Sequence, residues 1–242
     1  MRKKSEWGSS PTRIYRILNR LEKEKDSFTT CIVGCSDGKF VLPFARKKHF
    51  IVGYDIDRIA LYGGKKLFPI KRDITKKYEF ESTEGIVGNK ITSYKIPTEE
   101  RDMTGLLQKI KKDGLEKYVE IRLLDFFKSE VDKKYDLVFT SCSLHYKNNN
   151  AFSLEQLINK LKDAVEVDGY LYIDYMMTLF DYPTFESDLF CKPEQMKSFF
   201  VDEDWKVEYY REMKKPVFEA AHVDCVYDHF HRFGYLLAKR LK

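Results

Sequence analysis

A glycine turn and a later aspartate are the residues of this sequence whose types and spacing best suit ligand chemistry. The turn runs from Gly34 to Gly38 in the order Gly-Cys-Ser-Asp-Gly, and Asp55 lies 17 residues after Gly38. A glycine turn that opens a helix brings backbone N–H groups close to a ligand, and an acid after the next strand suits ribose hydroxyls. The pair therefore predicts a site for a nucleoside-type cofactor, with Ile56 beside the acid.

The segments around these residues have the patterns needed to position them. Thr29 to Val33 is a short, β-branched apolar run that is typical of a buried strand, and Phe50 to Tyr54 is a second one. Between them, Lys39 to Lys47 has the apolar spacing of a helix. The result is a strand, a glycine turn, a helix and a strand, closed by Asp55.

The spacing of the turn distinguishes between cofactors. In a dinucleotide fingerprint, G-x-G-x-x-G, the second and third glycines would fall on Ser36 and Lys39, which disfavours NAD. The actual pattern, G-x-S-x-G, also matches the nucleophile elbow of hydrolases. A hydrolase would leave Asp55 at the end of the next strand unexplained.

The same G-x-S-x-G turn resembles motif I of the Rossmann-like (class I) S-adenosylmethionine-dependent methyltransferases. The chain departs from that motif at Ile32, where the family usually has an acid, and at Ser36, where it usually has glycine. The resemblance implies S-adenosyl-L-methionine as the cofactor. The expected cofactor-binding residues are Gly34, Cys35, Ser36, Gly38, Asp55, Ile56, Asp125, Phe126 and Ser141.

Asp125 and Phe126 enter this set because they follow a third strand-like run, Val119 to Leu124. The resemblance implies that the acid accepts the adenine amino group and that the next side chain lies against the base. The alternative is that Asp125 caps the following turn.

The segment from Ser141 to Tyr146 follows a fourth apolar run, Tyr135 to Phe139. In a doubly wound sheet the ligand crevice lies beyond the ends of strands one and four. The segment resembles the (F/L)HY segment of messenger-RNA cap guanine-N7 methyltransferases, which touches the acceptor base. We expect His145 to be a base or a contact for the acceptor and Tyr146 to orient it. Alternatively, Leu144 anchors the loop while His145 points to solvent.

The histidines near the end of the chain raise the question of a metal. Alternation places His229 and His231 on one face of a predicted strand, and Asp224, Cys225 and Asp228 are nearby. Metals use such side chains. No tight ligand pair on a helix accompanies them, and histidine pairs on strands often only pack and form hydrogen bonds. We expect no metal site.

The order of the elements predicts the fold class. Five strand-like runs alternate with helices, and two closing strands follow at Trp205 to Glu212 and Tyr227 to Lys239. Such alternation predicts an α/β, doubly wound, mostly parallel seven-stranded sheet of order 3-2-1-4-5-7-6 with an antiparallel last strand. Other predicted elements are helices at 11–25, 58–67, 104–112, 152–165 and 191–200 and the fifth strand at 170–176. Residues 1–242 are expected to form a single methyltransferase domain, with an N-terminal helix or lid at 1–27 and a possible substrate-recognition insertion at 69–101.

Composition limits the remaining possibilities. The net charge of +5 resides entirely in residues 1–25, whose helix either meets nucleic acid or is simply a solvated face. No apolar run approaches the roughly 18 residues of a membrane span. The five cysteines lack metal-type spacing and are expected to be free thiols of a cytoplasmic protein with no membrane partner.

These features predict an S-adenosylmethionine-dependent methyltransferase acting on an N, O or S acceptor, with a small molecule favoured over RNA. Two alternatives are a cap-type RNA guanine-N7 methyltransferase and a non-catalytic Rossmann-like partner subunit, the latter suggested by Ile32 and Ser36. Because the sulfonium already carries an activated methyl group, the protein has mainly to align the acceptor and exclude water.

Overall fold

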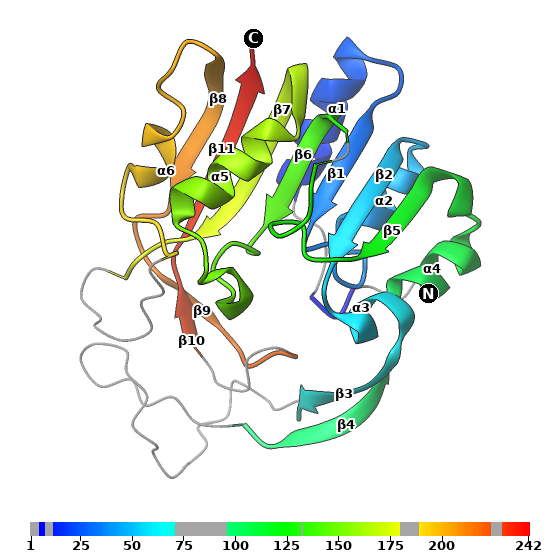
Figure 1. The fold of residues 1–242 in the computed structure, drawn as a ribbon. Coiled ribbons are helices and arrows are strands. Elements are labelled where there is room, and N and C mark those ends of the chain that lie inside the picture. Colours follow the sequence, from blue (N-terminus) through cyan, green and yellow to red (C-terminus); the bar gives the residue numbers. More distant parts are fainter. Residues whose placement is uncertain (1–4, 8–11, 71–95, 132, 180–188, 224–228) are drawn as a thin grey trace.

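The computed structural model describes residues 5–7, 12–70, 96–131, 133–179, 189–223 and 229–242. Its main sheet has seven strands in the order β5-β2-β1-β6-β7-β11-β8 (Figure 1). Their bounds are β1 Thr29–Val33, β2 Phe50–Asp55, β5 Val119–Leu123, β6 Tyr135–Ser141, β7 Val165–Met176, β8 Trp205–Glu212 and β11 Phe233–Arg240. Strands β5, β2, β1, β6 and β7 pair in parallel, and β11 is antiparallel to both β7 and β8. The predicted fold class, strand order and antiparallel last strand are confirmed.

Helices cover both faces of the sheet. Their bounds are α1 Thr12–Glu24, α2 Val41–Arg46, α3 Arg58–Tyr62, α4 Leu106–Asp113, α5 Leu154–Asp163 and α6 Gln195–Ser198, with short 3-10 turns at Glu116–Tyr118 and Lys147–Asn149. One face packs against α1, α2 and α4, and the other packs against α5 and α6 (Figure 1). No helix in the described part of the chain has the length and apolarity needed to cross a membrane.

Burial on both faces explains the continuous apolar run of β1 from Cys31 to Val33. Ile32 belongs to the core under α1 and α2, whereas Cys31 and Val33 belong to the core on the opposite face. A central parallel strand covered on both sides reads as a continuous hydrophobic run for this reason. The isoleucine that departs from motif I is therefore a core residue.

The predicted helix at 58–67 is shorter than expected. Helix α3 ends at Tyr62 because Gly63 and Gly64 follow with φ of +86° and +147°, which residues with side chains rarely adopt. The chain continues as β3 (Gly64–Pro69), which pairs antiparallel with β4 (Thr98–Met103). This two-stranded ribbon therefore connects the predicted insertion at 69–101 to the rest of the fold. The strands expected within the insertion lie almost wholly in 71–95, outside the described residues.

The single last strand predicted at 227–239 is wrong. The structure has two strands there, β10 (His229–His231) and β11, and β10 pairs instead with β9 (Val217–Glu219). The break lies at the buried Arg232, whose Nε donates to the Met213 carbonyl at 2.6 Å. The Arg232 carbonyl accepts from Met177 N at 2.8 Å, which ties the break to the end of β7.

The predicted helix at 191–200 is also shorter, with α6 covering only Gln195–Ser198. Cys191 is fully buried and forms an isolated parallel bridge with Met177. Its backbone is thus occupied by an extended pairing and cannot join the helix.

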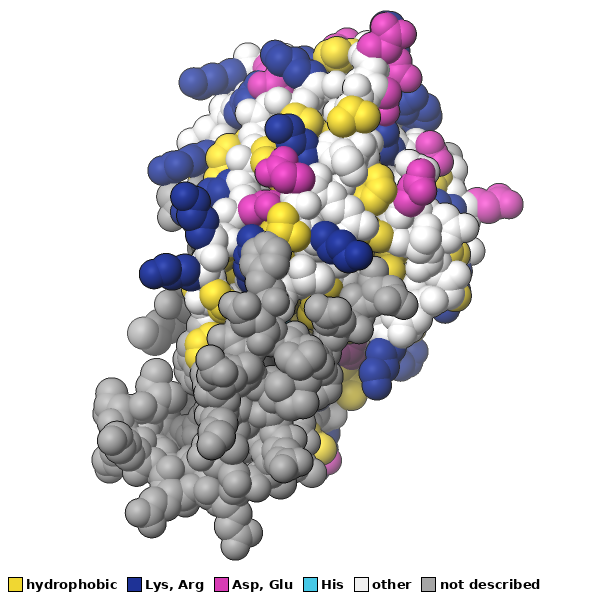
Figure 2. All heavy atoms as spheres, turned by 90° about the vertical axis from the view of Figure 1, so that its left-hand side faces the viewer, with side chains coloured by type: hydrophobic (Ala, Val, Ile, Leu, Met, Phe, Trp, Pro, Cys, Tyr) yellow, Lys and Arg dark blue, Asp and Glu magenta, His cyan; other side chains and the backbone are white. Residues whose placement is uncertain are grey.

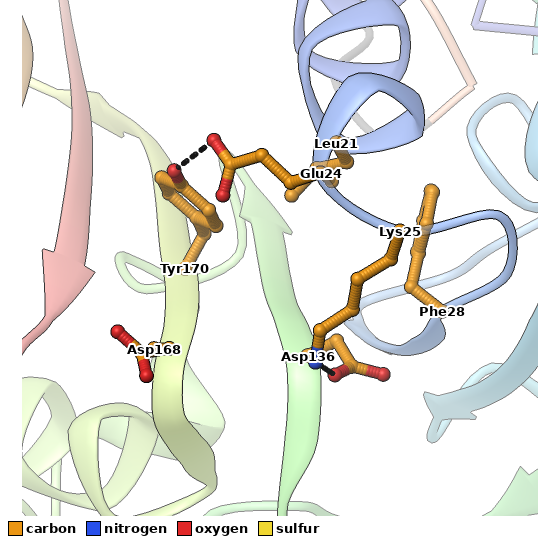
Figure 3. Close-up of a pocket in the computed structure, with 7 residues that line it drawn as sticks. All are labelled: Leu21, Glu24, Lys25, Phe28, Asp136, Asp168 and Tyr170. Carbon is orange, nitrogen blue, oxygen red and sulfur yellow. Dashed lines mark hydrogen bonds and ion pairs between the residues drawn. The ribbon is translucent and has the colours of Figure 1, made fainter.

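The acid that enters β6 is structural. A small hollow at the start of β6 is lined by Leu21, Glu24, Lys25, Phe28, Asp136, Asp168 and Tyr170 (Figure 3). Asp136 forms an ion pair with Lys25 and accepts hydrogen bonds from Thr29 N at 2.7 Å and Thr29 Oγ1 at 2.9 Å. Burial alone would raise the pKa of Asp136, but the hydrogen bonds from Lys25 and Thr29 outweigh it and lower that pKa. Asp136 therefore ties the end of α1 to β1 and β6.

Asp136→Asn should lower the free energy of unfolding at neutral pH by about 1–3 kcal/mol, because it removes charge-assisted acceptors. Asp168→Asn is the matched control, since Asp168 lines the same hollow with a side chain that is 71% exposed. The lowered pKa means that Asp136 stabilises the fold above pH 3.8 and that this contribution is lost as the pH falls below it. Denaturant titrations at neutral and acid pH measure the difference, and equal effects of the two substitutions would contradict the assignment.

Candidate cofactor and acceptor site

The carboxyl ends of β1, β2 and β6 bring the predicted segments together at one edge of the sheet. Gly34 follows β1, and the loop after β6 contacts it. A Cβ placed on Gly34 would lie 2.8 Å from Ser143 Cβ, and Gly34 has φ of +74°. Glycine is thus required here both by its backbone conformation and by the close approach of Ser143. The cofactor turn and the predicted acceptor loop are in direct contact.

Asp55 organises the turn from the end of β2. Its Oδ2 accepts from Ser36 N at 2.7 Å, and its Oδ1 accepts from Asp57 N at 2.8 Å. Burial raises the pKa of Asp55, and these N–H donors oppose that rise. The neighbouring Ile56 is 52% exposed. The carboxylate and an accessible apolar side chain therefore lie side by side at the sheet edge.

Asp37, which the sequence analysis did not single out, is the fourth residue of the turn and is fully buried. Lys109 Nζ from α4 donates to its Oδ2 at 2.7 Å and to its carbonyl at 2.9 Å. Ser5 Oγ donates to Oδ1 at 2.5 Å, and Glu6 N donates to Oδ2 at 2.8 Å. The sequence contained one signal: Lys109 lies on the buried face of α4, three residues after Leu106 and directly before Ile110.

The N-terminal residues cover the same turn. Trp7 Nε1 donates to Ser36 Oγ at 2.8 Å, so a residue of the predicted lid reaches the turn directly. Tyr15, the other aromatic side chain of this region, is 43% exposed on α1.

Three of the residues predicted to bind the cofactor have defined contacts within the protein: Cys35, Phe126 and Asp125. Cys35 is buried in the core against Gly53, and burial raises the pKa of its thiol well above the ordinary value. Phe126 is also a core residue, with its ring 5.1 Å from that of Tyr54 in an edge-on contact. Asp125 accepts from Phe127 N at 3.1 Å and caps the following turn, the alternative given above.

Gly38 and Ser141 have defined neighbours as well. Gly38 has φ of +92°, and a Cβ on it would lie 2.5 Å from Leu106 of α4, so the turn and that helix meet closely. Ser141 Oγ donates to Asp174 Oδ2 at 2.8 Å, and Tyr172 also donates to this carboxylate. Asp174 is a buried acid near the end of β7, and its signal in the sequence was a charge within an apolar run.

Two buried side chains hold the loop after β6 in place. Leu144 is buried in the core, and the buried Asn149 donates from Nδ2 to the carbonyls of Ser143 and Leu144, both at 2.9 Å. Leu144 therefore anchors the loop, as the second interpretation of this segment required.

His145 nevertheless does not point to solvent. Its ring stacks on Tyr146 at 4.9 Å and meets the edge of Phe190 at 5.6 Å, and its Nδ1 is buried without a hydrogen bond among the described residues. Burial, with a smaller contribution from His231, lowers the pKa of His145 to about 4. His145 is therefore neutral at pH 7.

This sheet order, with a glycine turn after β1 and an acid after β2, is the fold of class I methyltransferases. The chain belongs to the TehB family: the model of that family, described as tellurite resistance protein TehB, matches residues 85–220, more than half of the 242 residues. No curated protein sequence matches the chain significantly.

Solved structures show the same fold. TehB from Haemophilus influenzae has a TM-score of 0.61 and 14% identity over 95% of this chain, and the chain spans only 63% of that protein's length. Magnesium protoporphyrin IX methyltransferase from Synechocystis, solved with bound SAH, has a TM-score of 0.56 and 13% identity over 94% of this chain and 81% of its own. The N-methyltransferase NodS from Bradyrhizobium japonicum has a TM-score of 0.53 and 8% identity over 95% of both chains.

The fold shared with these solved structures agrees with the predicted class I methyltransferase fold. The family match begins after the glycine turn and after Asp55. The loop after β6, with His145 and Tyr146, lies within the matched segment.

Lys109→Met should destabilise the chain by about 3–5 kcal/mol, because it leaves the buried carboxylate of Asp37 without its charged partner. Lys111→Met on the same helix is the matched control, since Lys111 is exposed. Adding Asp37→Asn to Lys109→Met should recover part of the loss, since no uncompensated charge then remains. Urea unfolding measures all three variants, and a double variant less stable than Lys109→Met would contradict this account.

Proposed function

We propose that the chain transfers the methyl group of S-adenosylmethionine to a small-molecule acceptor at the edge formed by β1, β2 and β6. The observation that carries the proposal is the contact between Gly34 and Ser143, which joins the cofactor turn to the loop bearing His145. The solved neighbours support it, since one contains SAH and another is an N-methyltransferase.

In this proposal the cofactor lies across the turn from Gly34 to Gly38. Asp55 accepts the ribose hydroxyls, and the exposed Ile56 offers an apolar surface to the adenine. Trp7, held by Ser36, covers the turn and excludes water from it. Asp37 and Lys109 keep the backbone of the turn in place without touching the cofactor.

Asp55→Ala should weaken binding of S-adenosylmethionine and SAH by about tenfold to a hundredfold, the effect of losing hydrogen bonds worth about 1.5–3 kcal/mol. Asp26→Ala, which changes an exposed aspartate, is the control. Isothermal titration calorimetry with S-adenosylmethionine, SAH and NAD measures the affinities, and a melting curve checks folding. Tight NAD binding, or unchanged S-adenosylmethionine affinity in folded Asp55→Ala, would overturn the proposal.

The surface charges favour a small acceptor over RNA. Arg20 of α1 pairs with Glu208 at 2.8 Å, and Lys25 pairs with Asp136. On the side shown in Figure 2, the Lys and Arg side chains of the described residues are interspersed with acidic and hydrophobic ones. A phosphate backbone is usually bound by a continuous stripe of cations.

The low pKa of His145 determines its proposed role. A general base works best with a pKa near the working pH, and a group with a pKa of about 4 is a weak base at neutrality. We therefore assign His145 as a neutral contact that positions the acceptor, with the stacked Tyr146 orienting it.

His145→Gln should lower kcat/KM for the acceptor by about fivefold to tenfold, the effect of one lost hydrogen bond. Because His145 stays neutral above pH 4, the ratio of wild-type to variant rates should be constant from about pH 5 to about pH 8. Taking the ratio cancels ionisation of the acceptor itself. SAH release on thiols, amines, oxyanions and capped RNA identifies the acceptor. A loss above about a hundredfold that shrinks at low pH would instead show a general base, and release with RNA alone would overturn the small-molecule assignment.

A further inference from the structure

Glu219, His222 and His231 form a group that no step of the proposed function uses. Their side-chain ligand atoms all lie within 4.8 Å of one another, and each side chain is partly buried. Glu219 ends β9, His231 ends β10, and His222 follows β9 in the chain. In the sequence analysis, His231 was named together with His229, Asp224, Cys225 and Asp228, and the last three of these lie outside the described residues.

The spacing of these atoms suits a transition metal ion. A tetrahedral zinc with bonds of about 2.0–2.1 Å holds its ligand atoms about 3.4 Å apart. The separation between His231 Nε2 and Glu219 Oε2 is already 3.2 Å. Since the third ligand atom lies within 4.8 Å of both, side-chain movement on the order of 1 Å closes the site. Two imidazoles and one carboxylate are a donor set that zinc and its neighbours accept.

The group lies beside Trp7, the N-terminal residue that contacts the glycine turn. The ring of His222 meets that of Trp7 edge-on at 5.1 Å, and Trp7 donates to Ser36 of the cofactor turn. Figure 1 shows β9 and β10 below the carboxyl ends of the central strands.

The segment that carries His222 is fixed by packing. Val223 is buried in a small cluster with Ala60, Phe68 and Met103, and Trp7 packs against that cluster. His222 therefore has a defined place next to Trp7, as a preorganised ligand requires.

We propose that Glu219, His222 and His231 bind one divalent transition metal ion of the zinc type, whose open coordination position takes the sulfur or oxygen atom of the methyl acceptor. Three protein ligands leave such a position open. The metal lowers the pKa of the bound thiol or hydroxyl, so its proton goes to solvent without a general base. The anionic atom then forms a bond to the methyl carbon while the carbon–sulfur bond of the sulfonium breaks, and its electron pair stays on SAH. The acceptor role rests on the proposed function, whereas metal binding does not.

Titration of the metal-free, full-length chain with Zn²⁺, followed by calorimetry, should give one site per chain and a raised melting temperature. His222→Ala, His231→Ala and Glu219→Gln should each weaken Zn²⁺ binding by about a hundredfold or more, since even outer-shell changes cost about tenfold to a hundredfold. Glu203→Gln is the matched control because Glu203 is 84% exposed and pairs only with Lys242 in the described structure. Unchanged affinity in the three variants would overturn the proposal. So would an intense thiolate band with Co²⁺, because it would show cysteine ligation.

S-adenosylmethionine calorimetry on the same metal-free chain separates this inference from the proposed function. Cofactor binding without Zn²⁺ binding refutes the metal site alone, and Zn²⁺ binding without cofactor binding refutes the methyltransferase assignment alone. With both bound, chelation should lower kcat/KM for the acceptor, through slower methyl transfer and a higher KM, and leave the S-adenosylmethionine affinity unchanged. Turnover that is indifferent to chelation would refute the acceptor role.

Discussion

The buried carboxylate of Asp37 is the constraint on which the cofactor turn depends. A fully buried charge is costly unless it is paired and its remaining acceptor sites are filled. Lys109, Ser5 and the Glu6 N–H supply those partners. Because they come from α4 and from the N-terminal residues, the turn cannot take its observed conformation unless both segments are in place. Folding of distant parts of the chain is thereby coupled to the geometry of the site.

Four of the aspartates near the central strands have different surroundings, and their structural roles differ accordingly. Asp37 is paired with a lysine, and Asp136 at the opposite edge binds Thr29 and Lys25. Asp125 caps its own turn and pairs with Lys128, whereas Asp55 accepts from the backbone N–H groups of Ser36 in the glycine turn and of Asp57. Burial raises the pKa of Asp55, whereas the interaction with Lys25 helps to lower the pKa of Asp136. This contrast is consistent with a ligand-binding role for Asp55 and a structural role for Asp136.

The acceptor side combines a fixed loop with a histidine that stays neutral. Leu144 and Asn149 fix the loop, so His145 is held in an aromatic setting that disfavours its protonation. In the proposed methyl transfer, a histidine that is a weak base at neutral pH requires an acceptor that is already nucleophilic, or another way of removing its proton. The proposed metal at Glu219, His222 and His231 supplies the second.

The sequence by itself determined the order and type of the main elements and the position of the glycine turn after β1. Those features rest on local patterns: the apolar run of β1, the G-x-S-x-G turn and the acid after β2. Such patterns hold because strand and helix periodicity depends only on which faces are buried. The break between β10 and β11 escaped prediction because the hydrogen bonds of Arg232 to Met213 and Met177 involve residues far away in the chain.

Tertiary structure alone decided which side chains meet. Three interactions join segments that are distant in the sequence: the ion pair of Asp37 with Lys109, the close approach of Ser143 to Gly34 and the burial of Phe126 in the core. No local propensity encodes these contacts, because they arise where parallel strands separated by whole helices end at one edge of the sheet. The metal-type group likewise required β9 and β10 to pair, which places Glu219 within 3.2 Å of His231.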